Sequence, residues 1–221
     1  MHQKWDERYK EQEFAYGKEP NVFFKEQLPA FPPGTILMPA DGEGRNGVHA
    51  ASLGWKVTSF DLSVEGRSKA LQLAKEKGVT LEYIVADMEQ LYFEKATFYA
   101  IGLIYAHVDA EKKALFHRKI NDWLKPGGVL ILEAFSKAHL HFNERDPKVG
   151  GPKEIGMLYD KAEILADFKN YGILLLAEEV IVLQEGKYHS GEGSVIRFVG
   201  KKGLQEEKDC EKKSCSLKDA S

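Results

Sequence analysis

A glycine-rich turn that follows a short apolar run constrains the fold more than any other part of the chain. Gly42, Gly44 and Gly47 come after residues 35–39, which have the length and apolar character of a buried strand. A helix is expected directly afterwards, over residues 46–53. Glycines allow backbone conformations that a side chain blocks, and the start of a helix offers unpaired N–H groups. Strand, glycine turn and helix in this order predict a βαβ unit whose turn binds a ligand.

The rest of the chain continues this alternation. Further strands are expected over residues 56–60, 81–85, 99–106 and 129–135, and further helices over residues 64–77, 110–123 and 161–168. Two more strand-like runs, 172–183 and 194–201, are joined by a polar loop at residues 184–193. The pattern predicts an α/β fold with a doubly wound, mostly parallel, Rossmann-like sheet of about seven strands, helices on both faces and a C-terminal antiparallel hairpin.

Composition limits the partners and the compartment. The net charge of −3 gives no basic footprint for nucleic acid or for an anionic membrane surface, so neither partner is expected. Only two cysteines are present, Cys210 and Cys215, and both lie in a polar C-terminal stretch. A disulfide framework is therefore not expected, and a reducing, cytoplasmic setting is the simpler interpretation. His139 and His141 have a metal-ligand spacing without a third ligand nearby, so no metal site is expected.

Two cofactors compete for the glycine turn. The three glycines match the Gly-x-Gly-x-x-Gly fingerprint of nicotinamide dinucleotide sites. Asp61 ends the next strand at about the distance along the chain expected of an acid that binds ribose hydroxyls. A lone fingerprint of this kind is weak, and a glycine turn without a ligand is the alternative at this point.

A set of motifs along the chain favours one of these cofactors. They are WDERY (5–9), YGKEPN (16–21), GEGRN (42–46), FDLS (60–63), ADM (86–88), LKPGG (124–128), GGPK (150–153) and YHSG (188–191). In this order and spacing, over residues 4–202, the chain resembles the class I S-adenosylmethionine-dependent methyltransferases. Within them it is similar to the bacterial group related to tellurite-resistance and thiopurine methyltransferases.

This resemblance assigns roles to individual residues. The backbone around Ala40, Gly42 and Gly44 would cradle the amino-acid end of S-adenosyl-L-methionine. Asp61 would accept hydrogen bonds from both ribose hydroxyls, because charge-assisted bonds are the strong ones. The remaining cofactor-binding residues implied are Asn46, Leu62, Asp87, Met88 and Tyr105, with Leu62, Asp87 and Met88 around the adenine and Tyr105 near the methyl group.

The chain departs from the family pattern at two positions of the first strand and its turn. Met38 stands where the family usually has an acidic residue, and Ala40 stands where it has a glycine. The usual acid supports the loop or the ammonium group of the cofactor. Asp41 and Glu43 are the residues nearby that offer a substitute carboxylate.

Methyl transfer from a sulfonium is a one-step displacement in which the protein supplies binding and alignment. If the acceptor must lose a proton, His107, after the fourth parallel strand, is the candidate catalytic base, and a role in holding local backbone is its alternative. Tyr16, His189 and Arg197 are candidate substrate contacts. For Tyr16 the alternative is an aromatic anchor, and for the other two it is an ordinary surface position.

The sequence thus predicts an S-adenosylmethionine-dependent methyltransferase acting on a small molecule, such as a thiol or a soft inorganic anion. Residues 1–33 are expected as an N-terminal helical lid, 34–202 as the methyltransferase domain and 203–221 as a disordered polar tail. A monomer or weak homodimer is expected. The alternatives are a nicotinamide-dependent oxidoreductase, a protein methyltransferase, and a cofactor-binding protein without turnover.

Overall fold

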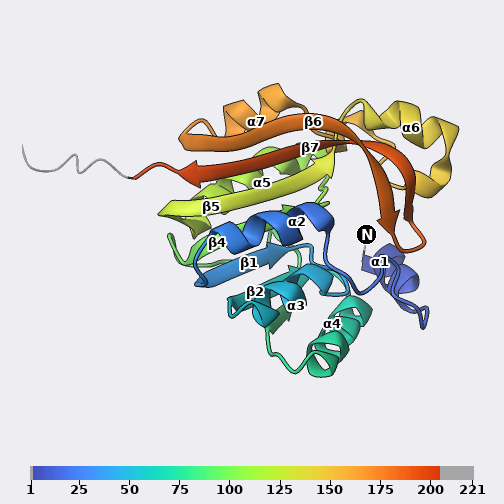
Figure 1. Cartoon of the computed structure of the whole chain (residues 1–221), viewed down its shortest axis with the longest axis horizontal. Coiled ribbons are helices and arrows are strands. Elements are labelled where there is room, and N and C mark those ends of the chain that lie inside the picture. The colour runs from blue at the N-terminus through green and yellow to red at the C-terminus, as the bar shows by residue number, and fades with distance from the viewer. Residues whose placement is uncertain (1, 205–221) are drawn as a thin grey trace, which may run out of the picture.

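Five parallel strands and one antiparallel pair form a seven-stranded sheet in the order β3-β2-β1-β4-β5-β7-β6 (Figure 1). A computed structural model describes residues 2–204 of the chain. The strands are β1 (Thr35–Pro39), β2 (Lys56–Asp61), β3 (Glu82–Val85), β4 (Phe98–Ile104), β5 (Leu124–Phe135), β6 (Tyr171–Glu185) and β7 (His189–Lys202). The predicted Rossmann-like sheet with a C-terminal hairpin is therefore confirmed.

Seven α-helices are found within the described residues, and three short 3₁₀ segments accompany them. The helices are α1 (His2–Tyr9), α2 (Val22–Gln27), α3 (Arg45–Ser52), α4 (Val64–Glu76), α5 (Ala110–Trp123), α6 (His139–Arg145) and α7 (Lys161–Asp167). The 3₁₀ segments are η1 (Leu28–Ala30), η2 (Pro147–Val149) and η3 (Ile155–Met157). None of the helices in this part of the chain is both long and apolar enough to span a membrane.

The sheet separates two layers of apolar side chains. On one face, Phe23 and Phe24 of α2 and Ala50 of α3 pack against β1, β4 and β5. On the other face, Phe116 and Ile120 of α5 form a larger cluster together with α7. Residues on both sides of β1 and β4 are almost fully buried, because helices cover both faces of the parallel strands. The carboxyl ends of these strands meet at one edge, where open α/β sheets bind ligands.

The hairpin is longer than its sequence pattern indicates. Strands β6 and β7 keep one register from Leu175, opposite Val199, to Glu185, opposite His189, so most of the predicted loop at 184–193 is strand. Helix α6 was not expected from the sequence either. In Figure 1 the far ends of β6 and β7 bend over the sheet toward α1 and the N-terminal segment. This extension adds polar side chains to the edge at which the parallel strands end.

The N-terminal segment lies against the same edge. Asn21 caps α2, since its side chain accepts a hydrogen bond from Phe24 N at 2.9 Å. Asp6 of α1 accepts a bond from the Ser63 hydroxyl at 2.6 Å and so ties α1 to the start of α4. Of the tail expected at 203–221, residues 205–221 lie outside the described part of the chain.

Candidate active site

The turn after β1 has the left-handed backbone that its glycines predict. Gly42 and Gly44 have φ of 54° and 80°, and Ala40 has φ of 51°. Ala40 is the position where the family resemblance expects glycine, and its left-handed φ explains that expectation. An alanine in this conformation carries roughly 1 kcal/mol of strain that a glycine does not. The turn therefore keeps the left-handed conformation at position 40, although alanine stands there in place of the family's glycine.

Gly42 and Gly44 serve different purposes within the turn. A Cβ at Gly42 would lie 2.6 Å from the Tyr9 hydroxyl, so this bare backbone faces α1. A Cβ at Gly44 would lie 2.4 Å from the Ala70 Cβ, so this position allows α3 and α4 to pack closely. Gly42 thus allows the Tyr9 side chain to pack against the main chain of the turn, and Gly44 allows the close packing of the helices that frame it.

Asp61 faces the glycine turn from the tip of β2. One carboxylate oxygen accepts from Gly42 N at 3.1 Å and the other accepts from Ser63 N at 3.0 Å. Its side chain is 8% exposed, and burial raises its pKa to about 6. A carboxylate oxygen accepts more than one hydrogen bond. Asp61 therefore keeps the capacity to accept further hydrogen bonds beside Gly42, and its contact with ribose hydroxyls stays a prediction.

Asp41 connects the turn to β2 and α3 by hydrogen bonds. It accepts from the Ser59 hydroxyl at 2.7 Å and from Gly47 N at 3.3 Å, and burial raises its pKa to about 7. Met38, at the position of the family's usual acid, is 1% exposed and packs in the apolar core. In this chain Asp41 thus makes the loop-supporting contacts.

The polar side chains around the turn hold the N-terminal segment. Glu43 accepts a hydrogen bond from Ala15 N at 2.8 Å and forms a 2.7 Å ion pair with Lys69. Asn46, a predicted cofactor contact, accepts from Asn21 N at 2.9 Å. The side-chain oxygens of Glu43 and Asn46 therefore bind the protein's own backbone and fix residues 15–21 over the turn.

The residues implied for the adenine lie together at the neighbouring strand ends. Ala86 N donates to Asp61 O at 3.0 Å, which places the segment after β3 beside the tip of β2. Met88 is 6% exposed within the apolar core on that side. Asp87 accepts from Glu89 N at 3.0 Å, and Leu62 directly follows Asp61. The structure thus brings together the three residues named for the adenine.

Tyr105 begins the loop after β4, also with a left-handed φ of 52°. Its N–H donates to Glu133 O at 2.8 Å, and its ring centroid lies 4.7 Å from that of Phe135. Burial, together with the Glu133 carboxylate, raises the pKa of Tyr105 well above its ordinary value, so the phenol stays neutral. A non-glycine residue held in this conformation at a strand end is typical of a functional position.

His107 uses both ring nitrogens to hold backbone. Nδ1 lies 2.8 Å from Met157 O, and Nε2 accepts from Phe135 N at 3.2 Å. Burial lowers its pKa to about 4, although the bond to Met157 raises it. Because both ring nitrogens are bonded to backbone, neither is available to take a proton from a methyl acceptor. This geometry favours the backbone-holding role over the catalytic role.

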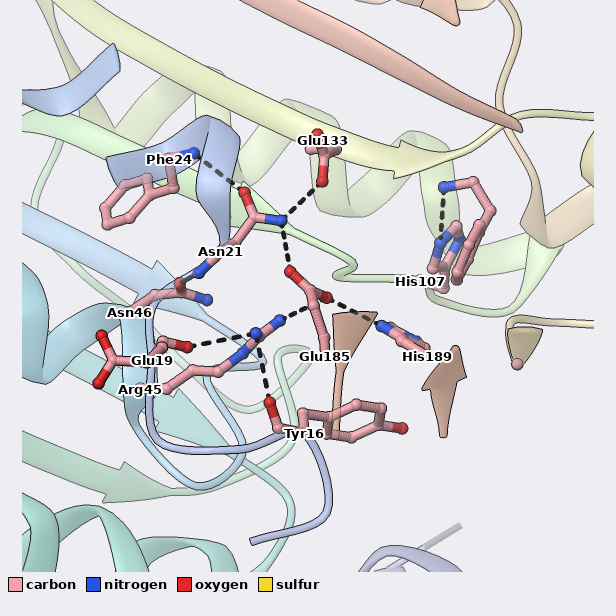
Figure 2. A network of polar contacts seen from close by, with 12 residues as sticks. Tyr16, Glu19, Asn21, Phe24, Arg45, Asn46, His107, Glu133, Glu185 and His189 are labelled. Atoms are coloured by element: carbon pink, nitrogen blue, oxygen red, sulfur yellow. Dashed lines mark hydrogen bonds and ion pairs between the residues drawn. The ribbon is translucent and has the colours of Figure 1, made fainter. Parts of the chain in front are cut away.

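A buried polar network joins the glycine turn to the hairpin tip (Figure 2). Glu185 forms a 2.9 Å ion pair with Arg45, which directly follows Gly44, and lies 3.1 Å from His189 Nδ1. The Asn21 amide donates to Glu185 at 2.9 Å and to Glu133 at 2.6 Å. Elements from both ends of the chain thus meet around one carboxylate.

Of the three predicted substrate contacts, His189 and Tyr16 lie together. Their ring centroids are 4.6 Å apart, and the Tyr16 hydroxyl accepts from Arg8 at 2.7 Å. Arg197 is engaged elsewhere, because it pairs with Glu133 at 2.7 Å and with Glu179 at 2.8 Å. It therefore stabilises the buried Glu133, and its contact with a substrate stays a prediction.

Sequence reasoning missed Glu185 and the roles of Asn21 and Arg45. Asn21 and Arg45 lie within two of the motifs that carry the family resemblance, YGKEPN and GEGRN, and these motifs were the sequence signal that could have indicated them. Glu185 lies in the stretch predicted as a polar loop, so its burial could not be seen in the sequence.

Part of the chain resembles known methyltransferase sequences. Residues 36–128 match a family described as "Methyltransferase domain". Over 86 residues, or 38% of this chain, the sequence is 31% identical to carboxy-S-adenosyl-L-methionine synthase of Aeromonas hydrophila. The match spans 34% of the length of that relative. Both the glycine turn after β1 and Asp61 lie within the residues that match the methyltransferase domain family.

Solved structures show the same fold over most of the chain. One, from a study of the conversion of a disulfide bond into a thioacetal group in echinomycin biosynthesis, has a TM-score of 0.74 and 16% identity, with 94% of each chain covered. A SAM-dependent methyltransferase of Methanosarcina mazei has a TM-score of 0.68 and 18% identity, with 85% of this chain and 100% of that chain covered. The chain therefore has the Rossmann-like methyltransferase fold. These findings support S-adenosylmethionine over a nicotinamide cofactor.

Proposed function

We propose that this protein is an S-adenosylmethionine-dependent methyltransferase that acts on a small-molecule acceptor. The observation that carries the proposal is the left-handed glycine turn after β1, with the Asp61 carboxylate accepting a hydrogen bond from Gly42 N. A left-handed glycine turn beside an acid at the next strand tip fits the two ends of an adenosyl amino acid. The methyltransferase fold and the domain match over residues 36–128 support the same activity.

Each end of the cofactor has residues that fit it. The backbone from Ala40 to Gly44 would hold the amino-acid end, and Asp61 would accept from the ribose hydroxyls. Leu62, Asp87 and Met88 would surround the adenine, and Tyr105 would lie beside the reacting group. When bound, the cofactor supplies a methyl group activated by a positively charged sulfur. The chain's own contribution is to hold and align the reactants, which lowers the barrier without a covalent step.

The acceptor we propose is a small molecule of the thiol or soft-anion type. Three observations support it. Tyr16 and His189 lie among other rings at the hairpin tip, which are surroundings that suit a small ligand. The motifs resemble the tellurite-resistance and thiopurine methyltransferase group. A structural neighbour belongs to a study of sulfur chemistry on a disulfide bond. The cytoplasmic setting, the monomer or weak homodimer and the absence of nucleic-acid binding stay predictions.

Isothermal calorimetry with S-adenosylhomocysteine tests the proposal. We expect micromolar binding by the wild type and at least tenfold weaker binding by Asp61→Ala, because two charge-assisted hydrogen bonds of about 1.5–3 kcal/mol each are lost. Asp61→Asn keeps the size of the side chain and separates loss of charge from loss of packing. Glu111→Ala, an exposed position on α5, is the matched control and should bind like the wild type. Wild-type protein that binds NADH and not S-adenosylhomocysteine would contradict the proposal.

A further inference from the structure

The tip of the β6–β7 hairpin places an acid and an imidazole face to face. Glu185 is the last residue of β6, His189 is the first of β7, and the two are paired in register. The Glu185 carboxylate lies 3.1 Å from His189 Nδ1. A carboxylate accepts hydrogen bonds and does not donate them, so Nδ1 carries the proton in the neutral ring. Nε2 is then the unprotonated nitrogen.

Glu185 is held in this position from three sides. Arg45 of α3 forms a 2.9 Å ion pair with it, and the Asn21 amide donates to it at 2.9 Å. Burial by itself would raise the pKa of Glu185, but the bonds from His189 and Arg45 lower it to about 2. Glu185 therefore stays ionised and fixes the orientation of the imidazole at neutral pH.

The His189 ring lies among aromatic side chains near the expected reaction centre. Its centroid is 4.6 Å from Tyr16, 4.7 Å from Tyr105 and 5.1 Å from Phe135. No hydrogen bond links Nε2 to another group in the described part of the chain, in contrast to His107, whose two nitrogens both hold backbone. His189 thus has the free nitrogen that His107 lacks.

Burial keeps the His189 ring neutral. Burial lowers its pKa, and the Glu185 bond opposes that shift. The other titratable or charged groups that face it are Arg45, Arg8, Tyr16, Tyr105, His107 and His139. A neutral, oriented imidazole with one free nitrogen is the arrangement that general-base catalysis requires.

We propose that His189 is the general base of this site and that the acceptor is a nucleophile that carries a proton, such as a thiol, a hydroxyl or a ring N–H. This inference rests on the proposed methyl transfer. As the bond between the acceptor atom and the methyl carbon forms, the methyl–sulfur bond breaks and its electron pair stays on sulfur. The acceptor's proton passes to Nε2, and Glu185 stabilises the resulting imidazolium. A soft oxyanion such as selenite has no need of this base.

Nuclear magnetic resonance tests the dyad without any acceptor. Long-range ¹H–¹⁵N spectra should show His189 at pH 7.5 with Nδ1 protonated and Nε2 bare, assigned through the signals that disappear in His189→Asn. Glu185→Gln should raise the population of the tautomer protonated at Nε2. A wild-type His189 that is cationic or protonated at Nε2 at this pH would overturn the assignment, whether or not the protein binds S-adenosylhomocysteine.

Transfer of labelled methyl groups tests the role in the reaction. The probes are 2-mercaptoethanol, catechol and benzimidazole, which carry a proton, and selenite. We expect His189→Asn to lower kcat for a proton-bearing probe by about 10²–10⁴-fold. Binding of S-adenosylhomocysteine should stay unchanged. The wild-type kcat should fall as pH decreases through the pKa of His189, whereas the residual rate of His189→Asn should follow the ionisation of the acceptor alone. His141→Asn, at an exposed position, is the control.

The outcomes separate this inference from the proposed function. If the wild type binds no S-adenosylhomocysteine, the proposed function fails. If it binds and transfers methyl groups to selenite alone, or to none of the four probes, the acceptor class inferred here is wrong. Equal kcat values and pH profiles for wild type and His189→Asn would remove His189 from the reaction.

Discussion

Substituting alanine for Gly44 tests whether this glycine is required for helix packing. Gly44 has φ of 80°, and a Cβ there would meet the Ala70 Cβ at 2.4 Å and its Cα at 2.9 Å. Gly54 has a similar φ of 87°, and a Cβ there would meet no atom within 4 Å, so Gly54→Ala is a matched control. Both substitutions place alanine in the left-handed region, but Gly44→Ala adds a steric clash with backbone.

The magnitudes follow from these two contributions. Left-handed alanine costs about 1–2 kcal/mol at either position. Overpacking adds about 1–3 kcal/mol at Gly44, because α3 and α4 must move apart. We therefore expect Gly44→Ala to lower the free energy of unfolding by roughly 2–5 kcal/mol and Gly54→Ala by roughly 1–2 kcal/mol.

Urea unfolding followed by tryptophan fluorescence measures both variants, since the chain has three tryptophans. A double variant, Gly44→Ala with Ala70→Gly, removes the contact with the Ala70 Cβ and should recover part of the loss. Equal destabilisation by Gly44→Ala and Gly54→Ala would refute the reasoning, because the clash would then contribute nothing.

Three further outcomes are expected. Ala40→Gly should raise the free energy of unfolding by up to about 1 kcal/mol in urea titrations, because it relieves the φ of 51°; a loss would show that the strain argument is wrong. Asn21→Ala should lower it by about 2–4 kcal/mol, because α2 loses its cap and Glu133 loses a buried donor; a loss below about 0.5 kcal/mol would contradict this. His107 stays neutral in the folded protein down to a pKa of about 4, while the unfolded chain binds a proton below about 6.5. The contribution of His107 to the free energy of unfolding should therefore fall as pH decreases from 6.5 to 4. Urea midpoints at pH 7 and pH 4.5 should then show that the stability difference between wild type and His107→Gln is smaller at pH 4.5. A stability difference that does not change with pH would contradict this prediction.

The parallel part of the fold could be predicted because its signals are local. Apolar runs of strand length alternate with amphipathic helices, and glycines or capping residues mark the boundaries, as Ser63 does for α4 and Gly44 for α3. The helix expected over 110–123 is found as α5 (Ala110–Trp123). Asp61 could be expected at the tip of β2 because the acid directly ends an apolar run.

The hairpin tip could not be predicted, because tertiary contacts decide its structure. Residues 184–193 contain Gln, Glu, Lys, Ser and three glycines, which is the composition of a loop. Glu185 and His189 nevertheless continue the strands, because Arg45 and Asn21, more than a hundred residues away in the chain, compensate the burial of the carboxylate. Because these contacts are long-range, the sequence indicated His189 only as a candidate substrate contact and did not indicate its pairing with Glu185.

The hairpin tip also binds the beginning of the chain, since Lys187 N donates to Ala15 O at 3.0 Å. Proteins are synthesised from the N-terminus, so residues 15–21 leave the ribosome long before β6 and β7 exist. The five parallel strands are also synthesised before Glu185 and His189, which form the acid–imidazole pair. The pair to which we assign the acceptor's proton therefore forms late in biosynthesis, after the strands on either side of the glycine turn have been synthesised.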